Sequence, residues 1–247
     1  MLPGVDDGPS DMEEALELAR LAVQDGTGTV LATPHVRDVD VDTVSDRVHE
    51  VRAALRAAGI ELTVLGGAEV AWDDVPSLTE RQLELIAQGP RGRRWVLLET
   101  PLFGDEGEEL CAAAGELARR GYAVLVGHPE RTDGLWEAGD ARLGAALQDG
   151  PAPLQVNASS LLGSHGEAAC RRARTVAASG RTALLASDAH RPTRGPCLSL
   201  AVAALIHAGI PEGIAEDMTA AIPRRLLDDG LTSPFRAGRV VRHADGL

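Results

Sequence analysis

The chain has 247 residues, of which 44% are apolar and only 2% aromatic, and its formal net charge is −13. This acidic balance argues against binding to nucleic acid or to an anionic membrane surface, because both need clustered Lys and Arg. A phosphoester substrate remains compatible with the charge, since bound cations could supply positive charge locally. The length suits one large α/β domain or two small ones, with a core of aliphatic side chains.

Cysteine usage and the N-terminal sequence predict a cytoplasmic protein. Cys111, Cys170 and Cys197 are far apart and odd in number, which fits a reduced intracellular protein better than a disulfide scaffold. The N-terminus has neither the basic nor the apolar region of a signal peptide. No uninterrupted apolar run approaches the roughly 20 residues of a membrane span.

Predicted helices and strands alternate along the chain. The first helix is expected to begin at a capping box formed by Ser10 and Glu13 and to continue through 12–26. Short apolar runs predict strands at 28–33, 61–70, 94–99, 122–127, 153–158 and 182–187. Helical patterns are expected at 43–59, 79–89, 107–121, 140–150 and 167–180, and over most of 197–229.

Uninterrupted apolar strands are typical of parallel sheets that helices cover on both faces. Six strand–helix units in a chain of this length favour a barrel over an open sheet. We expect one domain over residues 1–232. The polar stretch 233–247 is expected to be a loosely held tail.

Residues that can bind metal follow most of these strands. Successive positions are about 30 residues apart, which is the length of one strand–helix unit. A barrel would therefore gather their side chains at the C-terminal mouth, where barrel enzymes keep their chemistry. The residues are His35, Glu69, Glu99, His128, Asp188 and His190.

Imidazole and carboxylate together suit Mn, Fe or Zn, and a carboxylate can bridge two ions. Two such ions about 4 Å apart can hold a bridging hydroxide and clamp a phosphoryl group for in-line attack. Arg131 and Arg194 lie just beyond two of the candidate ligands, and guanidinium is a bidentate partner for phosphate oxygens. The pattern therefore predicts a metal-dependent phosphoester hydrolase.

Each residue also has a simpler interpretation. A single Glu at a strand end is more often solvated, and Asp188 could merely cap a helix. Asn157, which follows the fifth predicted strand, could be structural or could support a ligand. The remaining histidines, which lie in predicted helices or polar loops, are interpreted as structural: His49, His165, His207 and His243.

Other phosphatase and hydrolase chemistries lack their motifs. None of the three cysteines is followed by the arginine of a C-x5-R motif, which argues against a thiolate phosphatase. Neither a G-x-S-x-G elbow nor a P-loop occurs.

The motifs L-P-G-V-D-D-G-P, T-P-H, G-A-E, L-L-E, G-H-P-E-R, V-N-A-S-S and S-D-A-H-R-P-T-R occur in that order. The chain thereby resembles the PHP-domain protein-tyrosine phosphatases of the CpsB/CapC capsule and exopolysaccharide family. The resemblance spans Leu2 to about Leu231. It implies a distorted (β/α)7-type barrel with up to three metal ions, typically manganese. It also implies hydrolysis of phosphotyrosine on the tail of a membrane-associated tyrosine kinase.

Carried over by motif, the resemblance assigns two groups of site residues. Arg131 and Arg194 would hold the phosphate, and Asp188 would serve in catalysis as well as in metal binding. The metal ligands would be Asp7, His35, Glu69, Glu99, His128, Asp188 and His190.

The chain departs from the family pattern in one respect. Family members begin with a strand that ends in H-x-H just before L-P-G, and both histidines bind metal, whereas this sequence begins with Met1 directly before L-P-G. Either the translational start lies upstream or the chain is a true truncation. Retention of every other ligand position favours the upstream start.

Two alternative functions share these residues. The first is a PHP-type phosphatase that acts on a small molecule such as histidinol phosphate. The second is a non-catalytic, metal-poor remnant that binds a kinase or an export complex.

Overall fold

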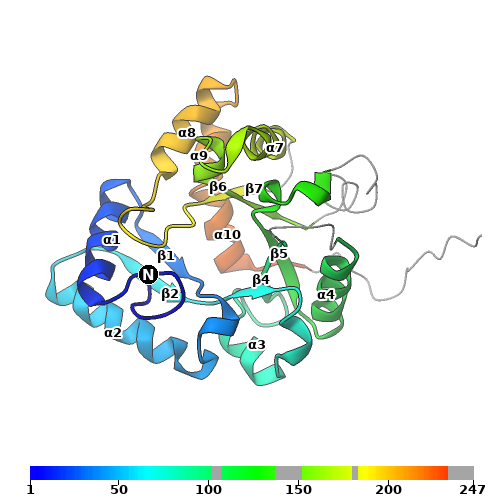
Figure 1. Cartoon of the computed structure of the whole chain (residues 1–247). Coiled ribbons are helices and arrows are strands. Elements are labelled where there is room, and N and C mark those ends of the chain that lie inside the picture. The colour runs from blue at the N-terminus through cyan, green and yellow to red at the C-terminus, as the bar shows by residue number, and fades with distance from the viewer. Residues whose placement is uncertain (102–106, 137–151, 180–182, 233–247) are drawn as a thin grey trace, which may run out of the picture.

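A computed structural model describes residues 1–101, 107–136, 152–179 and 183–232 (Figure 1). Each predicted strand is confirmed within a residue or two, except for the region 61–70, which forms two strands. The strands are β1 (Thr29–Ala32), β2 (Thr63–Gly66), β3 (Glu69–Ala71), β4 (Trp95–Glu99), β5 (Ala123–Gly127), β6 (Leu154–Asn157) and β7 (Ala183–Ala186).

All strand pairings between these elements are parallel. β1 pairs with β2, and a second sheet has the order β3-β4-β5-β6-β7. An isolated bridge between His35 and Glu69 connects the chain after β1 to the start of β3. The molecule is therefore an α/β protein with parallel sheets, as the apolar runs predicted. β1 and β7 are not hydrogen-bonded to each other in the sheets that the structure describes.

Helices surround the strands (Figure 1). Short 3-10 turns η1 to η5 lie at Val36–Asp38, Val41–Thr43, Val75–Ser77, Pro129–Arg131 and Asp133–Trp136. The α-helices are α1 (Met12–Gln24), α2 (Val44–Ala57), α3 (Glu80–Ile86), α4 (Gly107–Arg119), α6 (Ala158–Leu161), α7 (Gly166–Ala178), α8 (Leu198–His207), α9 (Glu212–Asp217) and α10 (Ala221–Asp229). The predicted helix 140–150 and the predicted tail 233–247 lie outside the described residues.

The prediction of one strand over 61–70 was wrong. The chain leaves the sheet at Gly67, so that β2 pairs with β1 while β3 pairs with β4. A Cβ at Gly67 would lie 3.2 Å from the amide nitrogen of Gln88 and 3.3 Å from Leu31. Glycine thus permits a close approach at the point where the chain changes sheets.

The predicted capping box of Ser10 and Glu13 does not form, and the N-cap lies one residue later. Asp11, not Ser10, is the N-cap of α1, and its side chain accepts a hydrogen bond from the backbone N–H of Glu14. The Glu14 carboxylate in turn accepts the backbone N–H of Ser10 at 2.6 Å and its hydroxyl at 2.8 Å. Asp competes well with Ser at an N-cap, so the sequence offered two adjacent caps.

The largest hydrophobic cluster fills the space between the five-stranded sheet and its helices. Leu98 of β4 is fully buried there, whereas Leu85 of α3 is 45% exposed. We expect Leu98→Ala to lower the free energy of unfolding by about 2–5 kcal/mol, because it removes packed methyl groups and leaves a cavity. Leu85→Ala should change it by less than about 0.5 kcal/mol. Urea denaturation of both variants measures the difference, and equal midpoints would contradict this placement of the core.

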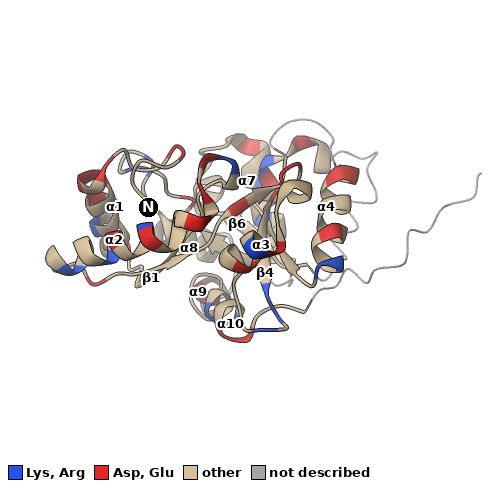
Figure 2. Ribbon diagram, turned by 90° about the horizontal axis from the view of Figure 1, so that it is seen from below, with Lys and Arg blue, Asp and Glu red and all other residues tan. Residues whose placement is uncertain are grey.

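α10 lies at the end of the strands opposite to their C-terminal ends. The indole N–H of Trp95, the first residue of β4, donates a 2.8 Å hydrogen bond to the carbonyl of Leu226 in α10. Leu231 N–H binds the carbonyl of Arg93 nearby. Figure 2 shows α10 below the strands. α10 therefore packs against the N-terminal end of the five-stranded sheet.

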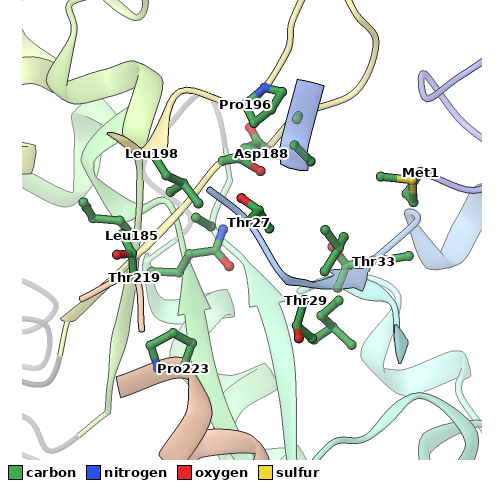
Figure 3. A pocket seen from close by; sticks show the side chains of 18 of the residues that line it. Met1, Thr27, Thr29, Thr33, Leu185, Asp188, Pro196, Leu198, Thr219 and Pro223 are labelled. Atoms are coloured by element: carbon green, nitrogen blue, oxygen red, sulfur yellow. The ribbon is translucent and has the colours of Figure 1, made fainter. Parts of the chain in front are cut away.

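A cavity of about 810 Å³ lies between β1 and β7 and reaches from the C-terminal ends of the strands down to α10. Thr29 and Thr33 lie across it from Leu185 and Thr219 (Figure 3). No helix in the described part of the chain is long and apolar enough to cross a membrane.

Candidate metal centre

Loops at the C-terminal ends of the strands bring the predicted site residues together. His35 follows β1, Glu69 begins β3, Glu99 ends β4 and His128 follows β5. Asp188 and His190 follow β7, and Asp7 comes from the loop that precedes α1. The convergence that the strand spacing predicted is therefore present in the fold.

His35 lies between two groups of carboxylates. Its Nδ1 is 3.5 Å from Asp6 Oδ2 and 4.0 Å from Asp7 Oδ1, and its Nε2 is 3.6 Å from Glu69 Oε2. Asp6 also accepts the backbone N–H of His35 at 3.1 Å, which fixes the loop before α1 against the end of β1. The imidazole of His35 thus lies between the two groups of carboxylates, with one ring nitrogen facing each group.

Glu69 joins His35 to the buried side of the site. Its Oε1 is 3.2 Å from His128 Nε2, and Glu99 Oε1 is 3.8 Å from the same nitrogen. His128 is 1% exposed and Glu69 is 6% exposed. Burial of so many ionisable groups is costly unless opposite charges or metal ions compensate for it.

The Asp188 carboxylate lies beside the two arginines of the site. Its Oδ2 accepts hydrogen bonds from Arg194 at 2.8 Å and from the Asn157 side-chain amide at 2.7 Å, and Arg131 lies 3.5 Å away. Nδ1 of His190 is 2.7 Å from the Asp188 carbonyl. Both arginines therefore lie beside the acidic cluster.

Asp7 links the two halves of the site. Its Oδ1 is 3.2 Å from His190 Nε2, and its Oδ2 is 3.7 Å from Arg194. Asp7 is also the most exposed of the predicted ligands, with 57% of its side chain accessible. It therefore lies at the rim of the centre.

Backbone strain is concentrated at the same place. Among the described residues other than glycine, positive φ angles occur at Asp6 (46°), His128 (32°) and Asp188 (49°). Each of these residues contributes a side chain to the cluster. Such conformations are sparsely populated and persist where the surrounding structure imposes them, which is common at functional sites.

The donor set fits divalent cations. Ligand atoms of Asp6, Asp7 and His35 lie within 4.8 Å of one another, and so do those of His35, Glu69 and Glu99. Nitrogen and carboxylate oxygen together suit Mn, Fe or Zn. The two groups share His35, so their candidate ligands are contiguous.

The pKa values show the charge imbalance that a cation would relieve. Burial raises the pKa of Glu99, and the neighbouring charge of Glu69 raises it further. Burial acts to lower the pKa of His128, but the hydrogen bond to Glu69 and the negative charges of Glu69 and Asp188 together outweigh it, and the pKa is raised. Both shifts favour the protonated forms of Glu99 and His128, which a bound metal would oppose.

The pKa of His35 is raised to about 9, first by its hydrogen bond to Asp6 and then by Glu69 and Glu99, against the opposing effect of burial. Without metal the ring is protonated below that pH, and it must lose the proton to bind a metal. We therefore expect apparent Mn²⁺ affinity to rise as the pH increases from 6.5 to 9. Calorimetric titration in buffers with different ionisation enthalpies should detect proton release, and a pH-independent affinity would contradict this prediction.

Sequence reasoning did not single out three residues of the site region. The first is Asp6: its neighbour Asp7 in D-D-G was predicted as the ligand, whereas Asp6 contacts both the backbone and the imidazole of His35. Glu130 is fully buried and accepts the Asn157 backbone N–H at 3.0 Å and the Ser160 hydroxyl at 2.7 Å. The third is His165, which was interpreted as structural.

The remaining histidines lie elsewhere. His49 is on the exposed side of α2, where its Nδ1 is 2.7 Å from the carbonyl of Ser45. His207 is at the end of α8, and His243 is outside the described residues. Asn157, whose role the sequence left open, is fully buried and contacts Asp188 directly.

Comparison with known proteins shows similarity over most of the chain. The model of the family described as "Capsular polysaccharide synthesis, CpsB/CapC" matches residues 1–228. CapC of Staphylococcus aureus is 28% identical over 79% of this chain and 76% of its own length. The tyrosine-protein phosphatase YwqE of Bacillus subtilis is 29% identical over 77% of this chain and 74% of its own length.

The fold is also similar to a solved one. A chain from the crystal structures of YwqE from Bacillus subtilis and CpsB from Streptococcus pneumoniae superposes with a TM-score of 0.73 and 25% identity. The match covers 94% of this chain and 93% of the solved chain. Those two proteins are described as unique metal-dependent tyrosine phosphatases.

Proposed function

Because the chain belongs to the CpsB/CapC capsular polysaccharide synthesis family, we propose that it is a metal-dependent protein-tyrosine phosphatase. Its relative YwqE is a tyrosine-protein phosphatase, and the solved YwqE and CpsB structures are of metal-dependent enzymes. The observation that carries the proposal is the continuous chain of contacts from Asp7 through His35 and Glu69 to His128. A bound divalent cluster would supply electrostatic stabilisation to a phosphoryl group in transfer.

We assign the metal ligands to the seven residues that the motifs indicated, with manganese as the metal. The donor set supports this assignment, since it combines imidazole with carboxylates. Asp6 is best placed as an outer residue: hydrogen bonds from His35 and Gly8 outweigh its burial and lower its pKa. It would orient His35, as carboxylates commonly do for metal-bound histidines.

Arg131 and Arg194 would hold the phosphate of the substrate. Both guanidinium groups lie against Asp188, at the edge of the metal cluster, and 43% of the Arg194 side chain is exposed. A phosphate could therefore contact the arginines and the metals at once. The substrate would be phosphotyrosine on a tyrosine kinase that regulates capsule or exopolysaccharide synthesis.

A substrate panel tests this function. We expect manganese-dependent release of phosphate from a phosphotyrosine peptide, loss of that activity with a chelator, and no effect of thiol alkylation, because none of the three cysteines belongs to the cluster. Faster hydrolysis of histidinol phosphate would instead favour a small-molecule PHP phosphatase. A chain that releases no phosphate and holds less than about one tight divalent ion would be a metal-poor binding partner.

We also propose that the fold is a PHP barrel whose H-x-H strand would lie between β1 and β7. Within the described sheets, β1 and β7 each have one edge without a partner strand, and these edges and the cavity between them support this position. A parallel strand in that cavity would end at the metal cluster, near Met1, which also lines the cavity. Adding such a strand before Met1 should raise the bound manganese per chain, and unchanged metal content and activity would count against this placement.

A further inference from the structure

Asp188 is held through one of its two carboxylate oxygens. Its Oδ2 accepts the side-chain amide of Asn157 at 2.7 Å and Arg194 at 2.8 Å, and Arg131 lies 3.5 Å away. Its Oδ1 lies 3.9 Å from Nδ1 of His190 and accepts no hydrogen bond from the residues that the structure describes. The carboxylate therefore has one oxygen that is held by donors and one that is available to a metal.

The donors to Oδ2 differ in burial and in charge. Asn157 is fully buried, whereas 43% of the Arg194 side chain and 19% of the Arg131 side chain are exposed. The amide is neutral and each guanidinium carries a positive charge. An incoming phosphate can therefore contact the arginines but not the amide.

The Asn157 side chain does not serve the helix that follows it. Asn157 is the N-cap of α6, and Asn is among the preferred N-caps, yet its side chain makes no capping hydrogen bond. An ionised Asp188 only accepts hydrogen bonds, so Nδ2 of the amide must face it. Oδ1 of the amide is then buried without a hydrogen-bond partner in the described part of the chain. Because a buried unpaired oxygen costs free energy, the bond to Asp188 explains this residue better than local stability does.

We propose that Asn157 is a positioning residue that keeps Asp188 in place when Arg131 and Arg194 turn to the phosphate of the substrate. This role rests on the proposed function, in which the arginines hold the phosphate and Asp188 binds metal. A bound phosphate competes with Oδ2 of Asp188 for the guanidinium N–H groups. The buried amide would then be the donor that remains on Oδ2 and leaves Oδ1 to the metal.

Two variants remove this donor. Asn157→Ala deletes the amide, and Asn157→Leu deletes it while filling a similar volume. Both keep the backbone N–H that binds Glu130. Ser160→Ala is the matched control, because the buried Ser160 hydroxyl donates to Glu130 rather than to Asp188.

The readout is the dissociation constant of Mn²⁺, measured by calorimetry with and without inorganic phosphate at a concentration that saturates the unchanged chain. The thermal midpoint of each chain without metal reports on the fold. A merely structural role for Asn157 would weaken Mn²⁺ binding equally in both conditions. The proposed role makes the loss depend on phosphate.

Without phosphate, we expect both Asn157 variants to weaken Mn²⁺ binding by less than about threefold, since the arginines still hold Asp188 and one neutral donor adds little. With phosphate, the loss should reach about 10–100-fold, the range for removal of a residue that orients a metal ligand. Ser160→Ala should lower the thermal midpoint and leave both dissociation constants unchanged.

Three outcomes overturn the proposal. One is an equal change, or no change, in Mn²⁺ binding with and without phosphate in the Asn157 variants. Another is a phosphate-dependent loss of the same size in Ser160→Ala. The third is failure of both Asn157 variants to fold, which would assign the residue to the fold alone.

Arginine variants distinguish failure of this inference from failure of the proposed function. If Arg131→Ala and Arg194→Ala weaken phosphate binding to the manganese-loaded chain but the Asn157 variants show no phosphate-dependent loss, only the role of Asn157 is wrong. If the arginine variants bind phosphate as the unchanged chain does, the proposed phosphate site is wrong and this inference falls with it.

Discussion

Glu69→Gln is expected to abolish metal-dependent hydrolysis while leaving the fold intact. The substitution keeps the volume of the side chain but removes the negative charge that lies between His35 and His128. Loss of an outer-shell partner alone typically weakens metal binding by about 10–100-fold. Loss of a carboxylate at the centre of the cluster should weaken Mn²⁺ binding by at least about 100-fold, with a comparable or larger fall in kcat/KM.

Glu61→Gln is the matched control for this experiment. Glu61 is exposed and precedes β2, so it lies at the end of the strands opposite to the metal cluster. It should leave metal content and hydrolysis unchanged. Metal analysis after gel filtration, with circular dichroism to verify folding, gives the comparison. Full manganese content in folded Glu69→Gln would remove Glu69 from the ligand set.

The strands and the convergence of the site were predictable because both depend on local patterns. Each buried strand is an uninterrupted apolar run, such as that of β5, and the residue after it is fixed at the mouth by the direction of the strand. His35, Glu99 and His128 could therefore be placed from sequence spacing alone. The break between β2 and β3 had a local signal in the Gly66–Gly67 pair, but its consequence, a change of sheet, is decided by packing.

The residues that sequence reasoning missed are defined by long-range contacts. Glu130 binds the backbone of Asn157 and the hydroxyl of Ser160, which lie 27 and 30 residues further along the chain. Nothing local distinguishes this buried glutamate from a solvated one in a polar motif. His165 likewise is connected to Glu130 of η4 only through Ser160, and the sequence does not show this contact. Such hydrogen-bond networks join different strand–helix units, so they can be identified only in the folded structure.

Arg131→Ala is expected to raise KM for a phosphotyrosine peptide by about 10–100-fold. This range corresponds to the roughly 1.5–3 kcal/mol of a hydrogen bond that involves a charged group, at about 1.4 kcal/mol for each tenfold change. The inhibition constant of inorganic phosphate should rise in parallel, because phosphate makes the same contact. Arg171→Ala is the control, since the Arg171 side chain is 70% exposed on α7 and pairs with Glu167 one turn away.

Arg131→Lys decides whether charge alone or the planar fork of the guanidinium matters. Lysine keeps the positive charge beside Asp188 but cannot form two parallel hydrogen bonds to one phosphate. If the fork binds the phosphate, KM for Arg131→Lys should lie between those of the unchanged chain and Arg131→Ala. Equal KM values for Arg131→Lys and the unchanged chain would mean that the residue contributes only its positive charge. An unaltered KM and phosphate inhibition constant in Arg131→Ala would place the phosphate elsewhere in the metal centre.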